Sequence, residues 1–479
     1  MTKITENQIK DSLDRGVELL KSGEKNDLND CLDIFNGILN LDRGAPAILF
    51  LIATALMKKE YNALAIEIYK LVIEKDPSQW NAWLNLGYCY KKDEYVLEAR
   101  EAFKKALEVK RKSGVKEEEA PTLINLGTTY IAQGQPREAL KYIEEALKLE
   151  PNNQEGLWNG SLAQLELGNY EKGWQWYSSG VRTEEGVKRN YGAEEMPEWD
   201  GSEGKTIVVY GEQGIGDEIM FASMIPDLIE KKKCKVIFDA HPRLYKIFRN
   251  SFKEVAVYGT RKDKEISWPF YHKIDACIPL ASCGKFLRNK KEDFPGLPYL
   301  KADSELVRKT CELLEPYSDK PRIGISWKGG TKKTNLRERT IKLKQFLPLF
   351  KNIDAHFFSL QYTEEAIKQI EKFEKEFGIT IHHWQDMIDD YDETAALVSQ
   401  LDFVISVPQS VVHLAGALGT PTIQLTPKQA MWQMGVYGED MPWYECIKNI
   451  WQKTNGDWDG VIKQTKDELC KLFQMSTKD

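Results

Sequence analysis

Asp217 has the clearest chemical potential in the sequence, because it directly follows a glycine-rich turn. The turn comprises residues 211–216 and contains Gly214 and Gly216. Glycine can adopt positive φ and lets the backbone approach a ligand, and a helix that starts here would direct free N–H groups at an anion. The pattern favours a ligand-binding strand–turn–helix connection with Asp217 at its mouth. A tight connection with a helix-capping aspartate is the alternative.

A second candidate site is the basic loop at residues 328–340, in which five of thirteen residues are basic. Its candidate ligand-binding residues are Lys328, Gly329, Gly330, Arg337 and Arg339. The loop follows an apolar run, so we place it beyond the carboxyl end of a strand, where glycines and cations suit a diphosphate. A solvated basic loop without a ligand is the alternative.

A third candidate lies in residues 407–421, where a strand-like run leads into a helix rich in small residues. Ser410 could cap this helix and face a phosphate. His413 falls in the first turn, where it could stack on a ring, bond a ribose or be a buried structural histidine. Gly416 would let the helix approach a sheet or a ligand closely.

Alternating strands and helices must position these three segments. We expect strands at residues 206–210, 235–240, 254–258, 273–278, 322–327, 355–360, 379–383 and 402–406. We expect helices at residues 219–231, 242–251 and 391–397. This alternation predicts two parallel, doubly wound sheets, each with its post-strand loops along one edge. Two such edges predict a ligand cleft between domains.

The N-terminal third of the chain repeats with a period close to 34 residues. A small residue recurs at Ala65, Ala99, Ala139 and Gly173, in steps of 34, 40 and 34 residues. Cys31 lies 34 residues before Ala65, which predicts a degenerate first repeat. A period of this length, with a small residue where two helices cross, is typical of tetratricopeptide (TPR) repeats that stack into an α-solenoid. The concave face of such a solenoid is the candidate surface for a protein or peptide partner.

Composition argues against several classes of protein. The 479 residues are 42% hydrophobic and carry a net charge of −7, which gives no electrostatic case for nucleic acid. The longest apolar run, residues 45–57, is shorter than the ~20 residues that span a bilayer. The N-terminus lacks a signal-peptide core, and eight scattered cysteines form no C-x-x-C pair. We therefore expect a cytoplasmic protein without a membrane span, a zinc site or a disulfide framework.

Residues 205 to about 470 resemble the glycosyltransferase family 9 (heptosyltransferase-like) module that often follows TPR repeats in bacterial proteins. The O-GlcNAc transferase group is a distant relative with the same layout. The matching stretches are Trp199-Asp-Gly, Glu212-Gln-Gly-Ile-Gly-Asp217, Gly324-Ile-Ser-Trp-Lys-Gly-Gly330, Arg337-x-Arg339-Thr-Ile, Ser359-Leu-Gln361, Asp392-x-Thr-Ala-Ala396, Leu401-Asp-Phe-Val-Ile-Ser406, His413-Leu-Ala-Gly-Ala-Leu-Gly419, Pro442-Trp-Tyr444 and Gly456-Asp-Trp458. Their order and spacing across both predicted domains make the resemblance specific.

The resemblance implies a GT-B fold, in which two Rossmann-like domains face a cleft. The N-terminal one would hold the acceptor and the C-terminal one a nucleotide-sugar donor. Asp217 matches the proposed catalytic base, which would take a proton from the acceptor hydroxyl with inversion at the sugar. Lys328, Arg337 and Arg339 would neutralise the leaving diphosphate in place of a cation. His413 and the helix after Ser410 would hold the nucleotide.

The full predicted site combines these assignments. The expected catalytic residues are Asp217 and Lys328. The expected nucleotide-binding residues are Gly214, Gly216, Gly329, Gly330, Arg337, Arg339, Gln361, Gln409, Ser410, His413 and Gly416. No metal and no cofactor beyond the nucleotide-sugar co-substrate are expected, and we interpret the acidic run at residues 389–392 as a helix start.

The chain departs from the family pattern at Pro408-Gln409, where relatives usually carry an Asp-Thr pair. Pro408 lacks a backbone donor, and a carboxylate or hydroxyl that would orient the donor is missing. Two functions therefore stay open. The favoured one is a glycosyltransferase whose solenoid recruits a protein or glycan acceptor. The alternative is a non-catalytic TPR scaffold with a degenerate, ligand-binding glycosyltransferase-like domain.

These observations predict four segments. TPR repeats occupy residues 8–180, and a charged connector follows at 181–200, where Trp199 packs against a neighbouring domain. The acceptor domain spans residues 201–315, and the donor domain spans residues 316–479.

Overall fold

The computed structural model shows two compact units, Met1–Ala163 and Gln164–Asp479. It describes residues 11, 15, 16, 18, 34, 46–114, 119–179, 191, 196–211, 213–330, 339–363, 365–429, 431–435, 438 and 441–473. The predicted repeat around Cys31 and most of the predicted connector lie outside these residues.

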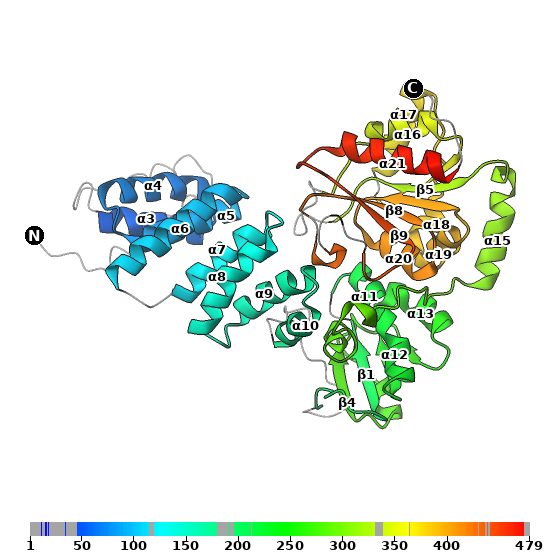
Figure 1. Ribbon diagram of the computed structural model, residues 1–479, viewed down its shortest axis with the longest axis horizontal. Coiled ribbons are helices and arrows are strands. Elements are labelled where there is room, and N and C mark those ends of the chain that lie inside the picture. Colours follow the sequence, from blue (N-terminus) through cyan, green and yellow to red (C-terminus); the bar gives the residue numbers. More distant parts are fainter. Residues whose placement is uncertain are drawn as a thin grey trace, which may run out of the picture. The chain divides into compact units, whose positions relative to one another are not determined.

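The first unit consists of helical hairpins (Figure 1, blue to cyan). Its helices are α3 (Pro46–Lys58), α4 (Asn62–Lys75), α5 (Trp80–Lys92), α6 (Val96–Ser113), α7 (Glu119–Ile131) and α8 (Pro136–Leu149). Successive helices pack as the pairs α3/α4, α5/α6 and α7/α8. Ala65, Ala99 and Ala139 are fully buried where helices meet, as the repeat pattern predicts. The longer 40-residue step arises partly in α6, which has 18 residues where α4 has 14.

A last hairpin, α9 (Gln154–Glu166) and α10 (Tyr170–Ser179), ends the array of repeats. Gly173 of α10 is buried, and a Cβ there would lie 2.8 Å from the Leu165 side chain, so the two helices cross closely. The boundary between the compact units falls at residues 163/164, so α10 belongs to the second unit.

The second unit contains a four-stranded parallel sheet in the order β3-β2-β1-β4. The strands are β1 (Thr206–Tyr210), β2 (Lys235–Asp239), β3 (Ala256–Tyr258) and β4 (Ala276–Pro279). The connecting helices are α11 (Ile215–Phe221), α12 (Ile225–Glu230), α13 (Tyr245–Ser251) and α14 (Gly284–Leu287). The helix predicted at 219–231 begins four residues earlier, and a 3-10 turn at Ala222–Met224 divides it.

A five-stranded parallel sheet follows, in the order β6-β5-β7-β8-β9. The strands are β5 (Arg322–Ser326), β6 (His356–Ser359), β7 (Phe403–Ser406), β8 (Thr422–Thr426) and β9 (Ile447–Trp451). The helices are α15 (Ser304–Leu314), α16 (Leu347–Asn352), α17 (Ala366–Phe377), α18 (Gln385–Asp389), α19 (Tyr391–Ser399), α20 (Ser410–Leu418) and α21 (Trp458–Leu472). The strand predicted at 379–383 is wrong, because only a single bridge between Phe358 and His382 forms there.

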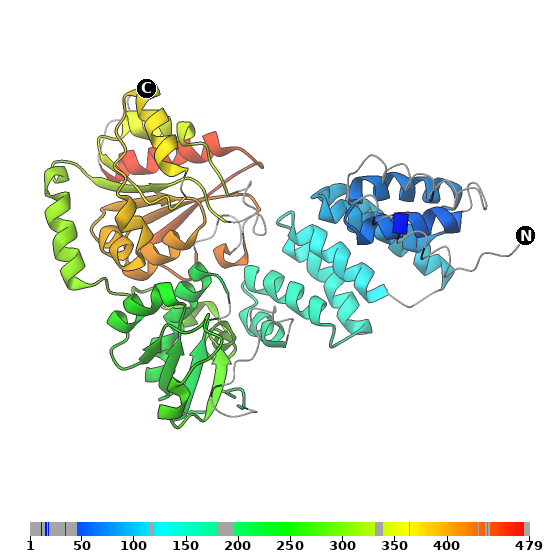
Figure 2. The ribbon, with the colours of Figure 1, turned by 180° about the vertical axis from the view of Figure 1, so that it is seen from behind.

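Helices cover both faces of the second sheet, which makes three layers (Figures 1 and 2). Apolar residues of α16, α17 and α21 pack with Ile323 and Ile325 of β5 in one core. Residues of α18, α19 and α20 pack with Val404 of β7 in another. Gly324 of β5 faces the second core, and a Cβ there would lie 2.7 Å from both Leu360 and Leu401.

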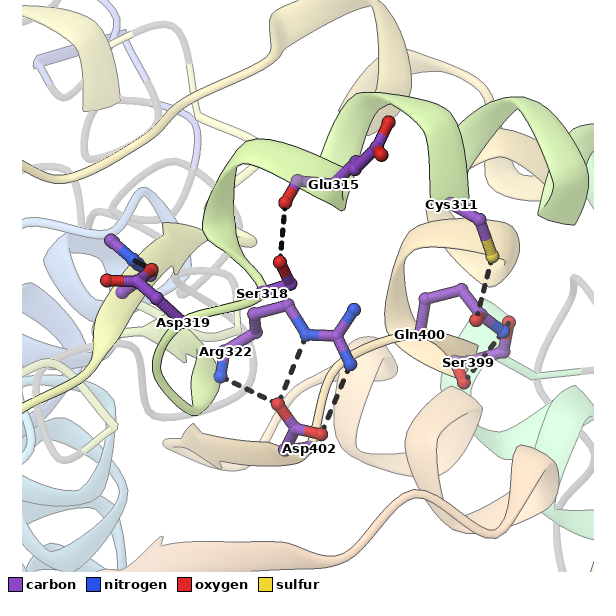
Figure 3. A network of polar contacts seen from close by, with 9 residues as sticks. Cys311, Glu315, Ser318, Asp319, Arg322, Ser399, Gln400 and Asp402 are labelled. Atoms are coloured by element: carbon purple, nitrogen blue, oxygen red, sulfur yellow. Dashed lines mark hydrogen bonds and ion pairs between the residues drawn. The ribbon is translucent and has the colours of Figure 1, made fainter.

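An ion pair fixes the amino ends of the central strands β5 and β7 (Figure 3). Arg322 donates from Nε and Nη2 to the two oxygens of Asp402, at 3.1 and 3.2 Å, and its backbone N–H donates to the same carboxylate at 2.8 Å. The ion pair lies at the end of these strands opposite the post-strand loops. Helical repeats followed by two parallel α/β sheets confirm the predicted TPR α-solenoid and GT-B fold.

Candidate functional site

A cavity of about 370 Å³ lies where the carboxyl ends of strands from both sheets of the second unit meet. The first sheet contributes the start of α11 and Arg243, and the second contributes the segments after β5, β6 and β7. The described lining residues are Gly214, Ile215, Gly216, Asp217, Arg243, Gly330, Arg339, Leu360, Tyr362, Ile388, Tyr391, Thr394, Gln409, Ser410, Val411, His413 and Met431. The sequence-predicted residues Gly214, Gly216, Asp217, Gly330, Arg339, Gln409, Ser410 and His413 are thus brought together.

Helices α11 and α20 cross beside this cavity, and Gly216 permits their approach. A Cβ at Gly216 would lie 3.1 Å from Cδ2 of His413 and 3.2 Å from Cα of Ser410. None of Gly211, Gly214 and Gly216 has positive φ, so that part of the glycine prediction is wrong. Close approach is the reason for Gly211 too, since its Cβ would lie 2.0 Å from the Glu218 carboxylate.

Asp217 is the third residue of α11, after the N-cap Gly214. Its Oδ1 accepts a hydrogen bond from Nε2 of Gln433 at 2.8 Å, and the backbone of Gly214 also bonds the carboxylate. Desolvation raises the pKa of Asp217, and the Gln433 bond, the Gly214 bond and the charge of Arg339 partly oppose that rise. Asp217 therefore combines a local helix-end contact with a place on the cavity wall.

Arg339 is the buried cation of the cavity, with 6% of its surface exposed. Gly330 has φ +83°, and a Cβ there would lie 2.0 Å from the guanidinium, so this position requires glycine. Backbone hydrogen bonds join Gly329 to Arg339 at 3.0 Å and Ile341 to Trp327 at 2.8 Å. These contacts bring the two ends of the predicted basic loop together. Arg337 lies outside the described residues.

Lys328 is placed differently from its predicted catalytic role. Its Nζ forms an ion pair with Glu365 at 2.9 Å, and Lys328 is not among the described residues that line the cavity. Glu365 is 66% exposed, so the pair lies at the surface. Arg339 is consequently the residue of this loop that supplies positive charge to the described cavity wall.

Gln361 and Gln409 hold the loops after β5 and β7. Oε1 of Gln361 accepts from Oγ of Ser326 at 2.9 Å and from the backbone N–H groups of Trp327 and Lys328 at 3.1 and 2.9 Å. Gln361 is fully buried and is not among the described lining residues, so its contacts are with the protein, in contrast to its predicted nucleotide contact. Gln409 donates to Oγ of Ser326 and also reaches the cavity.

The segment Pro408-Gln409 fits tightly against the neighbouring loop. A Cβ at Gly329 would lie 2.4 Å from the Pro408 carbonyl oxygen, so Gly329 serves close packing here and is not among the described lining residues. Gln409 is the N-cap of α20 but makes no side-chain capping bond. Ser410 was predicted to cap this helix and is instead its first residue, where it bonds Tyr391.

His413 connects α20 to the rest of the site. It is 4% exposed, its Nδ1 lies 3.3 Å from the Tyr444 hydroxyl, and burial lowers its pKa to about 4. Tyr444 in turn lies 3.3 Å from the Tyr299 hydroxyl, which donates to the Ile219 carbonyl at 2.6 Å. A Cβ at Gly416 would lie 2.5 Å from the Tyr444 ring, so Gly416 admits this tyrosine and not a ligand. At neutral pH His413 is an uncharged part of the wall.

Sequence reasoning missed several lining residues, notably Arg243, Tyr362, Tyr391 and Met431. Arg243 lies in the post-strand segment after β2, and its guanidinium is 5.1 Å from the centre of the Tyr391 ring. The post-strand position of Arg243 was the available signal. Tyr362, Tyr391 and Met431 lie in segments whose sequence patterns indicate a helix or a loop and give no signal of a ligand site.

The described residues contain no group of three or more His, Cys, Asp or Glu side chains placed to hold a metal ion. Across the same described ranges, every helix is too short or too polar to cross a bilayer.

Comparisons with known proteins support the N-terminal architecture. Residues 81–150 and 124–184 match tetratricopeptide repeat families. The chain is also similar to Protein FlbA of Caulobacter vibrioides, with 25% identity over 437 residues that cover 78% of this chain and 70% of that protein.

Two solved structures are similar to separate parts of the chain. YrrB, described as a TPR protein with an unusual peptide-binding site, is 22% identical and matches 30% of this chain and 72% of its own, with a TM-score of 0.27. The ADP-heptose LPS heptosyltransferase II of E. coli is 12% identical and matches 56% of this chain and 98% of its own, with a TM-score of 0.42. The chain therefore carries TPR repeats. The fold of its α/β half is described by the strand order of its two parallel sheets.

Proposed function

We propose that this protein is a glycosyltransferase that moves a sugar from a nucleotide-sugar to an acceptor. The observation that carries the proposal is the joint presence of a carboxylate and a buried guanidinium on one cavity wall. Asp217 comes from the first sheet and Arg339 from the second. Of the described lining residues, the charged ones are Asp217, Arg243 and Arg339, so cations outnumber anions, which favours an anionic ligand.

The proposed reaction uses these groups in sequence. Asp217 accepts the proton of an acceptor hydroxyl while the hydroxyl oxygen forms a bond to the anomeric carbon of the sugar. The bond from that carbon to the diphosphate breaks, and the diphosphate leaves with its electron pair. Arg339 and the N-terminal amides of α20 stabilise the negative charge that develops, and the proposal assigns no metal to this step. Attack opposite the leaving group gives inversion.

In this proposal the TPR unit binds and thereby selects the acceptor. A stack of helical hairpins offers an extended surface for a protein or peptide, as solenoids commonly do. The acceptor class is therefore proposed to be a protein segment or a glycan carried on one. A scaffold that binds a nucleotide without turnover is the competing function, which Pro408-Gln409 motivates.

Calorimetric titration with UDP, GDP, ADP and their sugar conjugates tests the donor site. We expect one nucleotide to bind selectively and Arg339→Met to weaken it at least tenfold, because a buried charge-assisted contact is lost. Lys328→Met is the matched comparison, since its ammonium is paired with the exposed Glu365 and Lys328 is not among the described lining residues. Equal losses in both variants would support the sequence-based role of Lys328, and binding of no nucleotide would remove the donor-site proposal.

Asp217→Asn tests the chemistry with a nearly isosteric side chain. We expect the variant to bind the selected nucleotide and to lose transfer by about 10²–10⁴-fold, because general-base catalysis contributes an effect of that size. The measurement is release of free nucleotide diphosphate in the presence of an acceptor. Nucleotide binding by a wild-type protein that shows no turnover with any acceptor would favour the scaffold.

A further inference from the structure

We propose that Gln433 is a positioning residue that holds the Asp217 carboxylate in place across the two sheets of the second unit. The inference rests on the proposed function, in which Asp217 is the base. Gln433 lies in the short turn Trp432–Met434, 216 residues from Asp217 in sequence. Its Nε2 donates to Oδ1 of Asp217 at 2.8 Å, a distance typical of a charge-assisted hydrogen bond.

The hydrogen bond to Asp217 is the side-chain hydrogen bond that Gln433 makes among the described residues. Only 5% of the residue is exposed, and its Oε1 has no hydrogen-bond partner among the described residues. Burying an amide whose oxygen has no hydrogen-bond partner costs folding free energy. A strong hydrogen bond from the amide nitrogen offsets that cost. The ionised carboxylate of Asp217 is the acceptor that makes such a bond. The amide therefore favours one rotamer and the charged form of Asp217.

The turn that carries Gln433 is held from two sides. The Trp432 ring packs against Phe221, the last residue of α11, with ring centres 6.3 Å apart. Beneath the turn, Nε2 of Gln424 lies 2.6 Å from the Met434 sulfur and donates to Asn449 at 2.8 Å. The turn is thus anchored both to the helix that bears Asp217 and to β8, which gives Gln433 a fixed origin.

Other charged and titratable groups also influence Asp217. Arg339 lowers its pKa, and the buried hydroxyl of Tyr444 interacts with it electrostatically. His413 on α20 and Arg243 share the cavity wall. His413 is neutral near pH 7, because its pKa is about 4. Gln433 differs from these groups in that its bond reaches an Asp217 oxygen directly.

The test measures the titration of Asp217 in the full chain without any substrate. Carboxyl-¹³C aspartate is incorporated, and the Asp217 resonance is assigned from its loss in Asp217→Asn. In Gln433→Met, which keeps the side-chain length and removes the donor, we expect the pKa of Asp217 to rise. Gln433→Glu should raise it further, because two close carboxyl groups cannot both ionise.

Gln424→Met is the matched control, since it removes a fully buried amide beneath the same turn and does not touch Asp217. Because Gln424 supports the turn without bonding Asp217, we expect a smaller rise of the Asp217 pKa than in Gln433→Met. A titration that is unchanged in both Gln433 variants overturns the inference, as does an equal rise in Gln424→Met, which would make turn packing the cause. Circular dichroism shows whether each variant folds. If Gln433→Met does not fold, the Asp217 titration in Gln433→Glu is compared with that of wild type instead.

Transfer kinetics separate this inference from the proposed function. The acid limb of the pH profile of kcat/KM should move to higher pH in Gln433→Met together with the Asp217 titration. Below that limb kcat/KM should fall by about tenfold to a hundredfold, the effect of losing a hydrogen bond to a charged group. A raised Asp217 pKa in a protein without transferase activity would support the positioning contact and remove the proposed function.

Discussion

Glu218, the neighbour of Asp217, anchors the start of α11 from inside the first sheet's core. It is 2% exposed, and its carboxylate accepts from the His241 backbone N–H at 2.6 Å and from Nη1 of Arg261 at 2.5 Å. Desolvation raises the pKa of Glu218 to about 7, although Arg261 opposes this. The ion pair with Arg261 thus only partly offsets the cost of burying the carboxylate.

That raised pKa predicts a pH-dependent stability. The folded protein holds the Glu218 proton more tightly than the unfolded chain, whose ordinary value is 4.5. The stabilising contribution is therefore complete below pH 4.5 and is lost as the pH rises to about 7, with a slope of up to ~1.4 kcal/mol per pH unit. Urea unfolding of wild type and Glu218→Gln across this window measures it. The variant should lack the part of the slope that Glu218 contributes, and parallel profiles would contradict the prediction.

At this scale the sequence predicts side chains that follow a local pattern and misses those that arrive from elsewhere. Asp217, Gly330 and His413 lie in glycine-rich or post-strand segments, and all three reach the cavity. Gln433 has no such signal, because only folding brings it to Asp217. Lys328 is a different case, since its place in the loop suggested a ligand, whereas in the structure its ammonium pairs with Glu365.

Among the elements, the crossing of α11 and α20 determines the shape of the cavity. Gly216 lies at the crossing, and the space beside it is limited by His413 and Ser410. The turn motif marked this glycine, and the sequence analysis attributed it to positive φ and to close approach of a ligand. Its φ is not positive, so the packing partner, which sequence does not reveal, is the actual constraint.

A graded series at Gly216 tests this packing. Gly216→Ala requires shifts of a few tenths of an ångström, because its Cβ would lie at 3.1–3.2 Å from its neighbours. Gly216→Val needs more room and should cost about 1–3 kcal/mol in folding stability, the usual range for overpacking. Thermal unfolding and nucleotide titration should show losses that grow from alanine to valine. Equal behaviour of valine and wild type would show that the crossing is not tight.

Element boundaries show where local signals compete. The sequence placed the start of the helix after β1 at residue 219, whereas Gly214 caps it and the acidic residues Asp217 and Glu218 fill its first turn. The strand expected at residues 379–383 has strand-like composition, but only His382 pairs, with Phe358 of β6. Composition alone does not show how far such pairing extends along the chain.

For the molecule as a whole, Trp174 of α10 connects elements of the second unit that lie far apart in sequence. It is fully buried, and its ring centre lies 6.2 Å from Phe221, 5.8 Å from Trp432 and 6.4 Å from Trp443. A Cβ at Gly284 would lie 2.5 Å from the Trp174 ring. The aromatic cluster therefore joins α10, α11 and the Gln433 turn.

Trp174→Ala should destabilise the second unit by about 3–5 kcal/mol, the usual cost of removing a buried aromatic ring. Trp176 on the same helix is a matched control, because it is half-buried and its described ring contact is with Lys172. Trp176→Ala should cost less than about 1 kcal/mol. Hydrogen exchange of α11 peptides in the full chain measures the effect. Equal exchange in both variants would contradict the proposed importance of the cluster.

The overall architecture was accessible from sequence because periodicity extends over long stretches. The 34-residue repeat and the strand–helix alternation each recur several times, so errors at single elements did not alter the prediction of two parallel sheets after a helical array. The end of that array was not accessible, since α10 has the repeat pattern but packs in the second unit.

This assignment of α10 constrains how the protein can diversify. Solenoid repeats contact mainly their neighbours, so insertions or deletions of whole hairpins before α9 change the length of the array without removing a residue that packs against α11. Loss of the final hairpin would instead leave an empty space in the aromatic cluster around Trp174. Lineages are therefore expected to vary in the number of early repeats and to keep the last one.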